Sequence, residues 1–344
     1  MAIFLAILAI SMMIIVHEAG HFFVARWSGM RVDRFSLGFG PPILKVTSKG
    51  TQFQLAPILF GGFVHIVGMN PHEDYDEKDP SVYPNRPTIL RFLTIFAGPA
   101  TNMLLAVVLA FSVFTIAGVD VRTGRTVVVD VGKDEPADGQ LRPDDLILSV
   151  NGQPLTADTF HSQVQHAYGA PMVLKVLRAG REEQVIVTPR FKDGANGYLL
   201  GIHIQSELTH QKLGLGRAAV ESLRYPIVKS KLILGMLWQI ATGKVEGKLS
   251  GPVGITSEIS KSIQNGWVDA FELLALLNVY LALINLLPFP ALDGGRLAFL
   301  TYELATRRRP NAKVETAVHL AGGLVLVVIM LLVTYKEVTS KLFS

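Results

Sequence analysis

The chain has 344 residues, of which 49% are hydrophobic and 17% charged, against roughly 25% charged in soluble domains. This composition and the mean hydropathy of +0.37 favour a membrane protein. The net charge is +4, and its placement along the chain is more informative than its size. Cysteine is absent, which excludes a disulfide framework, a thiolate metal site and a cysteine nucleophile. Any metal must therefore be held by histidine and carboxylate.

The first predicted element is a transmembrane helix over residues 1–25. The run is apolar apart from Ser11 and the cluster of His17, Glu18 and His21, and it is close to the ~20 residues that cross a bilayer. A signal peptide is the alternative, but a basic segment before the run and a small-residue cleavage site after it are both missing. Arginines follow the run instead, which favours a retained helix whose C-terminal end lies in the cytoplasm.

Residues 26–90 are predicted to form a β-structure against the cytoplasmic side of the membrane, followed by a loop. Between Arg31 and Met69, short apolar runs alternate with glycine and proline, which indicates two or three strands with tight turns. Asn70 to Pro87 is polar, acidic and contains proline, which is typical of a flexible loop.

Further transmembrane helices are predicted at 91–118, 269–300 and 314–335. Pro288 and Pro290 interrupt the third span. Lysines and arginines gather in the loop after the first span and in the loop before the last. Both loops are therefore assigned to the cytoplasm, and both termini and the long segment after the second span to the outside.

Residues 120–205 are predicted to be a small α/β domain outside the membrane. They contain hairpin turn signals at Asn151-Gly152 and Ala179-Gly180. Residues 206–268 are predicted to be an amphipathic helix and a linker. The longest apolar run of this helix is too short to span a membrane. The fold class is thus a polytopic α-helical membrane protein with four transmembrane helices, a membrane-associated β-structure and one extracytoplasmic domain.

The first predicted span contains His17-Glu18-Ala-Gly-His21, an H-E-x-x-H motif that is typical of zinc metalloproteases. Residues four apart lie on one face of a helix, so both imidazoles can bind one zinc ion, with Glu18 as a general base for water. Ionisable groups inside a transmembrane helix are costly and usually functional. The alternative is three polar residues that only face a water-filled bundle interior.

Asp293 is the predicted third zinc ligand. It lies in Asn285-Leu-Leu-Pro-Phe-Pro-Ala-Leu-Asp293-Gly-Gly, where the prolines leave an irregular backbone of the kind that is tolerated at membrane depth only inside protein or beside a wet cavity. Asp293 and His21 both lie near arginines, which predicts a site near the cytoplasmic face. The alternative is that Asp293 is a helix N-cap.

These paired motifs resemble the site-2 protease family of intramembrane metalloproteases, in the bacterial branch typified by the regulator of sigma-E protease. FSLGFGP after the first span, FAGPATN opening the second and SGPVGI before the third are similar too. The resemblance implies a zinc site made by His17, His21 and Asp293, with Glu18 activating water. It also implies that Asn285 binds the substrate backbone or stabilises the oxyanion, against the alternative of a helix-packing hydrogen bond.

In the family, the membrane β-structure is the proposed substrate-binding element, which here points to Gly61, Gly62 and Phe63. An exposed strand edge could pair with an unwound substrate helix, although a hairpin that only packs remains the alternative. Two other histidines, His65 and His319, are interpreted as hydrogen-bonded packing residues rather than ligands.

Residues 120–205 resemble the PDZ domain of this branch. The peptide groove would be bordered by the GYLLGI strand, and strand addition is the usual mode of binding. This assigns the groove to Tyr198, Leu199, Leu200, Gly201 and Ile202. A Gly-Asp pair is usual where Asp144-Asp145 stands. Two roles are possible for this domain, namely binding of a peptide and exclusion of bulky substrates by size.

The resemblance implies a zinc-dependent endopeptidase of a bacterial inner membrane. Its expected partners are the lipid bilayer and single-pass membrane substrates already trimmed by another protease, such as anti-sigma factor regulators or remnant signal peptides. No nucleic-acid partner is expected. A non-catalytic scaffold would need a fourth protein ligand on its metal, and a transporter would need a polar path through spans that have almost none.

Overall fold

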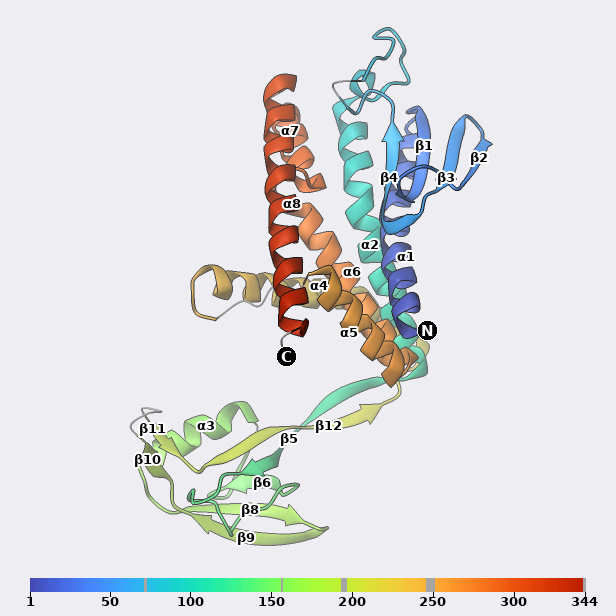
Figure 1. The fold of residues 1–344 in the computed structure, drawn as a ribbon. Helices are drawn as coiled ribbons and strands as arrows, with labels where there is room; N and C mark the ends of the chain where they lie inside the picture. The colour runs from blue at the N-terminus through green and yellow to red at the C-terminus, as the bar shows by residue number, and fades with distance from the viewer. Residues whose placement is uncertain (71–72, 156, 193–196, 246–250, 343–344) are drawn as a thin grey trace. The chain divides into compact units, whose positions relative to one another are not determined.

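The computed structural model describes residues 1–70, 73–155, 157–192, 197–245 and 251–342 (Figure 1). The chain divides into two compact units. Unit 1 comprises Met1–Ala117 and Gly214–Ser344, and unit 2 comprises Gly118–Leu213.

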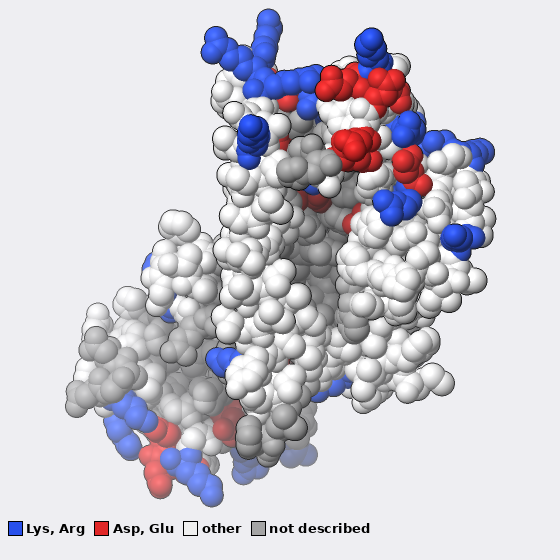
Figure 2. Space-filling view, turned by 45° about the horizontal axis from the view of Figure 1, so that its top comes forward, with Lys and Arg blue, Asp and Glu red and all other residues white. Residues whose placement is uncertain are grey.

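Unit 1 is built mainly from helices. They are α1 (Ala2–Trp27), α2 (Thr88–Ile116), α4 (Leu215–Ala241), α5 (Pro252–Asn265), α6 (Trp267–Leu286), α7 (Asp293–Thr306) and α8 (Ala312–Leu342). Within the described part of the chain, four of these are long and apolar enough to cross a membrane, namely α1, α2, α6 and α8. Figure 2 shows a broad surface of unit 1 almost without charged side chains, with charges gathered at one end.

The interruption predicted in the third span, 269–300, is present at Pro288 and Pro290. Helix α6 ends at Leu286 and α7 begins at Asp293. Pro288 cannot continue a helix, and Ala291 adopts a left-handed backbone with φ of 71°. Gly295 packs directly on this break, because a Cβ there would lie 2.5 Å from the carbonyl oxygen of Phe289. The break places Asp293 in the first turn of a new helix.

A buried ion pair ties α7 to α2. The Arg91 guanidinium lies 2.5 Å from Glu303 Oε1, and both side chains are less than 10% exposed. Thr88 donates a hydrogen bond to the same oxygen at 3.0 Å. The helix that begins with Asp293 is therefore held against the helix that follows the β-structure.

The segment 206–268 contains more helix than the sequence indicated. Its amphipathic helix is α4, and the part expected to be a linker forms a second helix, α5. Pro252 stands in the first turn of α5. A proline is tolerated there because the first N–H groups of a helix have no hydrogen-bond partner within the helix. Ser250 of the SGPVGI motif lies outside the described residues.

The β-structure after α1 has four strands rather than two or three. They are β1 (Val32–Phe39), β2 (Leu44–Ser48), β3 (Thr51–Leu55) and β4 (Ile58–Ile66), in the order β2-β3-β1-β4. β1 is parallel to β3 and antiparallel to β4. β4 is thus the last strand of the sheet, and Figure 1 shows it beside α1. Of the predicted loop over 70–87, residues 71 and 72 lie outside the described residues.

Helices α1 and α2 approach closely because glycines stand at their contact. A Cβ on Gly20 would lie 2.6 Å from Thr101 Oγ1. Thr101 also donates a hydrogen bond to the carbonyl oxygen of Val16 at 2.9 Å. Small residues that let backbones meet, together with hydroxyls that bond across, are typical of helix packing in membranes.

The described residues of unit 2 form a sheet with one helix and a core of their own. Its elements are β5 (Val119–Val131), β6 (Leu146–Val150), β7 (Gln153–Pro154), α3 (Ala157–His166), β8 (Met172–Arg178), β9 (Arg181–Val187), β10 (Arg190–Lys192), β11 (Gly197–Leu199) and β12 (Ile202–Gln211). The sheet runs β12-β5-β6-β8-β9, and β10 pairs with β11 separately. Both predicted hairpin turns are confirmed, because Asn151-Gly152 and Ala179-Gly180 have positive φ throughout.

Asp144-Asp145 fits unit 2 despite departing from the family's Gly-Asp. Asp144 has φ of 70°, a conformation that favours glycine but that aspartate tolerates. The side chain of Asp145 is 2% exposed and lies 2.6 Å from Arg178. Burial raises the pKa of Asp145, but the hydrogen bonds from Arg178 and from the Arg142 N–H outweigh this and hold the pKa below its ordinary value.

Candidate functional site

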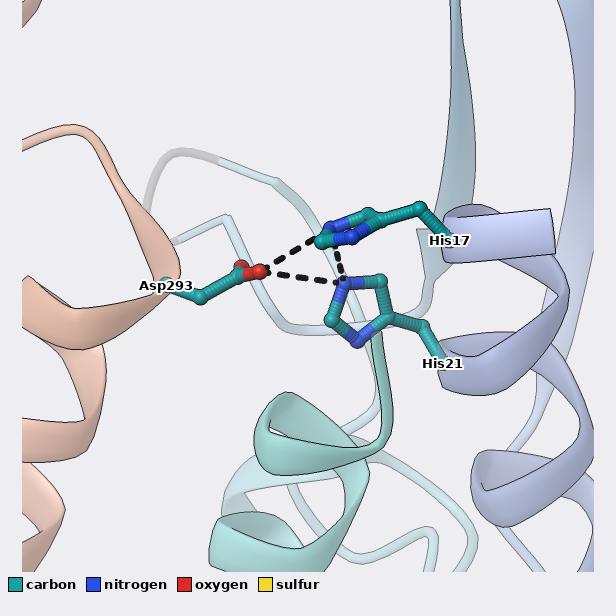
Figure 3. A group of neighbouring side chains, drawn as sticks. All are labelled: His17, His21 and Asp293. Atoms are coloured by element: carbon teal, nitrogen blue, oxygen red, sulfur yellow. Dashed lines mark hydrogen bonds and ion pairs between the residues drawn. The ribbon is translucent and has the colours of Figure 1, made fainter. Parts of the chain in front are cut away.

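Two histidines of α1 form one side of the site. His17 and His21 stand one helical turn apart, and each is 8% exposed. Their Nε2 atoms lie 3.2 Å from each other. The spacing of the motif therefore brings both imidazoles to the same point beside the helix, as Figure 3 shows.

Asp293 reaches the same point from α7. Its Oδ2 lies 3.0 Å from His17 Nε2 and 3.4 Å from His21 Nε2. The α6–α7 break presents this carboxylate to α1, and Figure 3 shows all three side chains converging. Because α7 begins at Asp293 with Leu292 as its N-cap, Asp293 does not act as the helix cap.

The Nδ1 atom of each histidine has a hydrogen-bond partner, which leaves the lone pair on Nε2 facing Asp293. His21 Nδ1 lies 2.8 Å from the carbonyl oxygen of Thr94, which only accepts, so His21 carries its proton on Nδ1. The Nε2 of His21 is then an acceptor. Such a partner on the outer nitrogen is the usual companion of a metal-binding histidine.

Asn102 of α2 plays the same part for His17. It is fully buried, and its amide lies 3.0 Å from His17 Nδ1, while its Oδ1 has no hydrogen-bond partner. Turning the amide by 180° lets Oδ1 accept from the His17 Nδ1–H and satisfies both groups. Asn102 is the last residue of FAGPATN, which the sequence related to the family without a role for this amide.

The three facing atoms fit a zinc ion. Two imidazole lone pairs and a carboxylate oxygen repel one another at 3.0–3.4 Å unless a cation lies between them. Zinc ligands at about 2.0–2.1 Å in a tetrahedron are about 3.3–3.4 Å apart, which matches these separations. Asp293 Oδ2 is buried and has no hydrogen-bond donor. Nitrogen and carboxylate donors are also the ligand types that zinc takes in proteins without cysteine.

Glu18 is held by the β-structure. Its Oε2 accepts a hydrogen bond of 3.0 Å from the backbone N–H of Val64 in β4. Gly62 of β4 lies beside the same side chain, because a Cβ there would be 3.7 Å from Glu18 Cγ. The carboxylate next to His17 is therefore positioned by the strand expected to bind substrate.

Gly98 of α2 makes room for the two rings. A Cβ at this position would lie 2.8 Å from His17 Nε2 and would overlap the imidazole of His21. No larger residue fits here without moving the atoms that face the metal position. This glycine belongs to FAGPATN, which the sequence related to the family without a role.

The other predicted residues lie as follows. Gly61, Gly62 and Phe63 are on β4. Gly62 lies beside Glu18, whereas Gly61 and Phe63 contact the ring of Phe39. Asn285 is half-buried in the last turn of α6, and it is not part of the group in Figure 3. Its role in binding substrate or oxyanion stays a prediction.

The two histidines interpreted as packing residues have partners elsewhere. His65 Nε2 lies 3.3 Å from Glu73, in a group that also includes Asp33, but Arg31 already pairs with Asp33 at 3.2 Å. His319 Nδ1 accepts the backbone N–H of Ala291 at 2.9 Å. Neither histidine belongs to the group around Asp293.

The predicted groove residues of unit 2 line a cavity of 410 Å³. It is bordered by α3 on one side and by β11 and the start of β12 on the other, with Tyr198, Leu199, Leu200, Gly201 and Ile202 among its residues. The side chain of Gln165 binds both backbone groups of Tyr198. Strand β12, which begins at Ile202, is the last strand of its sheet.

Comparison with known proteins agrees with this geometry. The model of peptidase family M50 matches residues 5–330. Relatives named "putative zinc metalloprotease" include one from Clostridium perfringens, 32% identical over 98% of both chains, and one from Fusobacterium nucleatum, 30% identical over 100% of both. A solved PDZ domain of an SdrC-like protein from Listeria innocua covers 25% of this chain and 98% of that domain, at 23% identity and a TM-score of 0.23. The family match covers nearly the whole chain, including both halves of the candidate metal site, and the chain therefore belongs to peptidase family M50, the zinc-dependent site-2 proteases.

Proposed function

We propose that this zinc metalloprotease hydrolyses peptide bonds within or near the transmembrane segments of its substrates. The observation that carries the proposal is the place of the site. Two of its three ligands lie on α1, a helix that is long and apolar enough to cross a membrane, and the third follows the break after α6, another such helix. Ionisable side chains in such helices are costly and mark functional sites.

The residues of the site suit peptide hydrolysis. His17, His21 and Asp293 would hold the metal, leaving a fourth position open as in catalytic zinc sites. Zinc, when bound there, lowers the pKa of water toward ~7 and polarises the scissile carbonyl. Glu18 takes the proton from the attacking water and delivers it to the leaving amine, while the Val64 N–H keeps its carboxylate in place.

Strand β4 is the proposed docking edge for substrate. A transmembrane helix hides its peptide bonds in its own hydrogen bonds, so it must unwind before water can attack. β4 ends its sheet and carries Gly62 and Val64 beside Glu18. An unwound segment that pairs with this edge would come to lie next to the base.

We further propose single-pass membrane proteins, trimmed beforehand by another protease, as the substrates. Anti-sigma factor regulators and remnant signal peptides are the classes that the family resemblance favours. The lysines and arginines near the span ends support a bacterial inner-membrane location with both termini and unit 2 outside and the site near the cytoplasm.

The test is a cleavage assay in detergent with a single-span substrate that lacks its outer domain. The protein should cleave it within or near the span, and 1,10-phenanthroline should stop cleavage until zinc is added back. The fragments are located by mass spectrometry. Cleavage only in the soluble flanks of the substrate, far from the span, would contradict the intramembrane assignment.

We also propose that unit 2 is a PDZ domain whose groove between α3 and β12 takes an extended peptide. The cavity is lined by apolar side chains on α3, and β12 offers an edge strand. Exclusion of bulky substrates by size is the competing role.

Ile202→Arg is expected to weaken binding of a peptide with an apolar C-terminus about 10-fold, the effect of losing a central contact. Fluorescence polarisation with the full chain measures the affinity. Ile186→Arg on β9, a position 57% exposed and away from the cavity, is the matched control. A wild-type chain that binds no peptide would favour the size filter instead.

A further inference from the structure

The loop between α6 and α7 needs support to present Asp293. Residues 287–292 form neither helix nor strand. Its described backbone hydrogen bonds are short-range, such as that from the Leu292 N–H to the Phe289 carbonyl at 3.2 Å. Ala291, two residues before the ligand, has φ of 71°, a left-handed conformation that is unfavourable for residues other than glycine. Another contact must therefore favour this conformation.

His319 of α8 supplies that contact. Its Nδ1 lies 2.9 Å from the N–H of Ala291 and can only accept there, which places the histidine proton on Nε2. The ring lies against α7 as well, because a Cβ on Gly295 would be 3.2 Å from its Cε1 and the Phe299 ring centre is 5.7 Å away. The imidazole thus bridges the loop and the first turns of α7, on either side of Asp293.

The backbone of α8 closes over the same loop. A Cβ on Gly322, one turn after His319, would overlap the side chain of Pro290 and lie 2.8 Å from the Pro290 carbonyl oxygen. A Cβ on Gly323 would touch Ala291 at 3.6 Å. These glycines let α8 approach closely enough for the histidine to reach the Ala291 N–H.

We propose that His319 is a positioning residue, which holds the 287–292 loop in the conformation that places Asp293 against His17 and His21. The proposal rests on the zinc site proposed above. Without an acceptor, the Ala291 N–H loses the hydrogen bond that favours the left-handed backbone. The loop then relaxes, and the carboxylate leaves the position that matches zinc.

The test compares two replacements that differ in one property. His319→Asn keeps an acceptor, because the amide Oδ1 stands close to where Nδ1 was, whereas His319→Leu keeps the bulk and removes the acceptor. Thr316→Ala is the control on the same helix, since the described hydrogen bond of the Thr316 side chain is to the Ala312 carbonyl of α8 itself. Asp293→Ala reports on the zinc site itself. Each purified protein is loaded with zinc, and zinc loss to a chelator is followed over time.

His319→Leu should lose zinc about 10-fold faster than wild type, in the range for supporting residues of metal sites, while His319→Asn and Thr316→Ala stay within about 3-fold of it. Circular dichroism and gel filtration confirm the fold of each variant. Equal zinc retention by His319→Leu and wild type would overturn the proposal. Equally fast zinc loss from His319→Asn and His319→Leu would also overturn it, because the hydrogen-bond acceptor would then have no effect. Zinc retention by Asp293→Ala would instead refute the ligand set.

Discussion

Glu18→Gln is expected to abolish cleavage while zinc stays bound. Glutamine has the same shape, and its amide oxygen can still accept the hydrogen bond from the Val64 N–H. It cannot take a proton from water, and loss of a general base lowers the rate by about 10²–10⁴-fold. Because the ligands His17, His21 and Asp293 are unchanged, zinc content should equal that of the wild type.

The measurement is the initial rate of cleavage of a single-span substrate, with zinc determined by elemental analysis on the same samples. Glu258→Gln is the matched control, since Glu258 is an exposed residue of α5 whose described partner is Lys261 at 3.8 Å. Wild-type turnover by Glu18→Gln would remove Glu18 from the role of base. Loss of zinc from it would show that the carboxylate supports the metal directly.

Gly98→Ala is expected to lower zinc affinity by about 100-fold, the upper end of effects from residues around a metal site. The added methyl group would lie 2.8 Å from His17 Nε2 and would overlap the His21 ring, so at least one imidazole must turn away. Alanine favours a helix more than glycine does, so α2 itself should not be weakened.

Zinc content after dialysis against a weak chelator measures this effect, and proteolytic activity should fall in parallel. Gly235→Ala on α4 is the control, because a Cβ there meets nothing within 4 Å. Full zinc occupancy in Gly98→Ala would mean that the metal position is not where the three facing atoms place it.

Much of the local structure could be predicted from the sequence because it depends on neighbouring residues. Apolar runs of sufficient length predicted four spans, and the structure has four helices of that kind in its described part. Turn signals at Asn151-Gly152 and Ala179-Gly180 predicted two hairpins correctly. The predictions that were wrong concerned the number of strands after α1 and a linker at the position of α5.

The spacing of the motif placed His17 and His21 on one face of a helix, because four residues are close to one helical turn. It did not show which residues form hydrogen bonds with the two imidazoles or pack against them. Asp293 was paired with the histidines through resemblance and similar depth, whereas Asn102, Gly98 and the Val64 N–H went unassigned. Their contacts join residues far apart in the chain, and only the packing of α1 against α2, β4 and α7 brings them together. Periodicity and composition depend on residues that are neighbours along the chain, so they could not predict contacts that form only when distant helices and strands pack together.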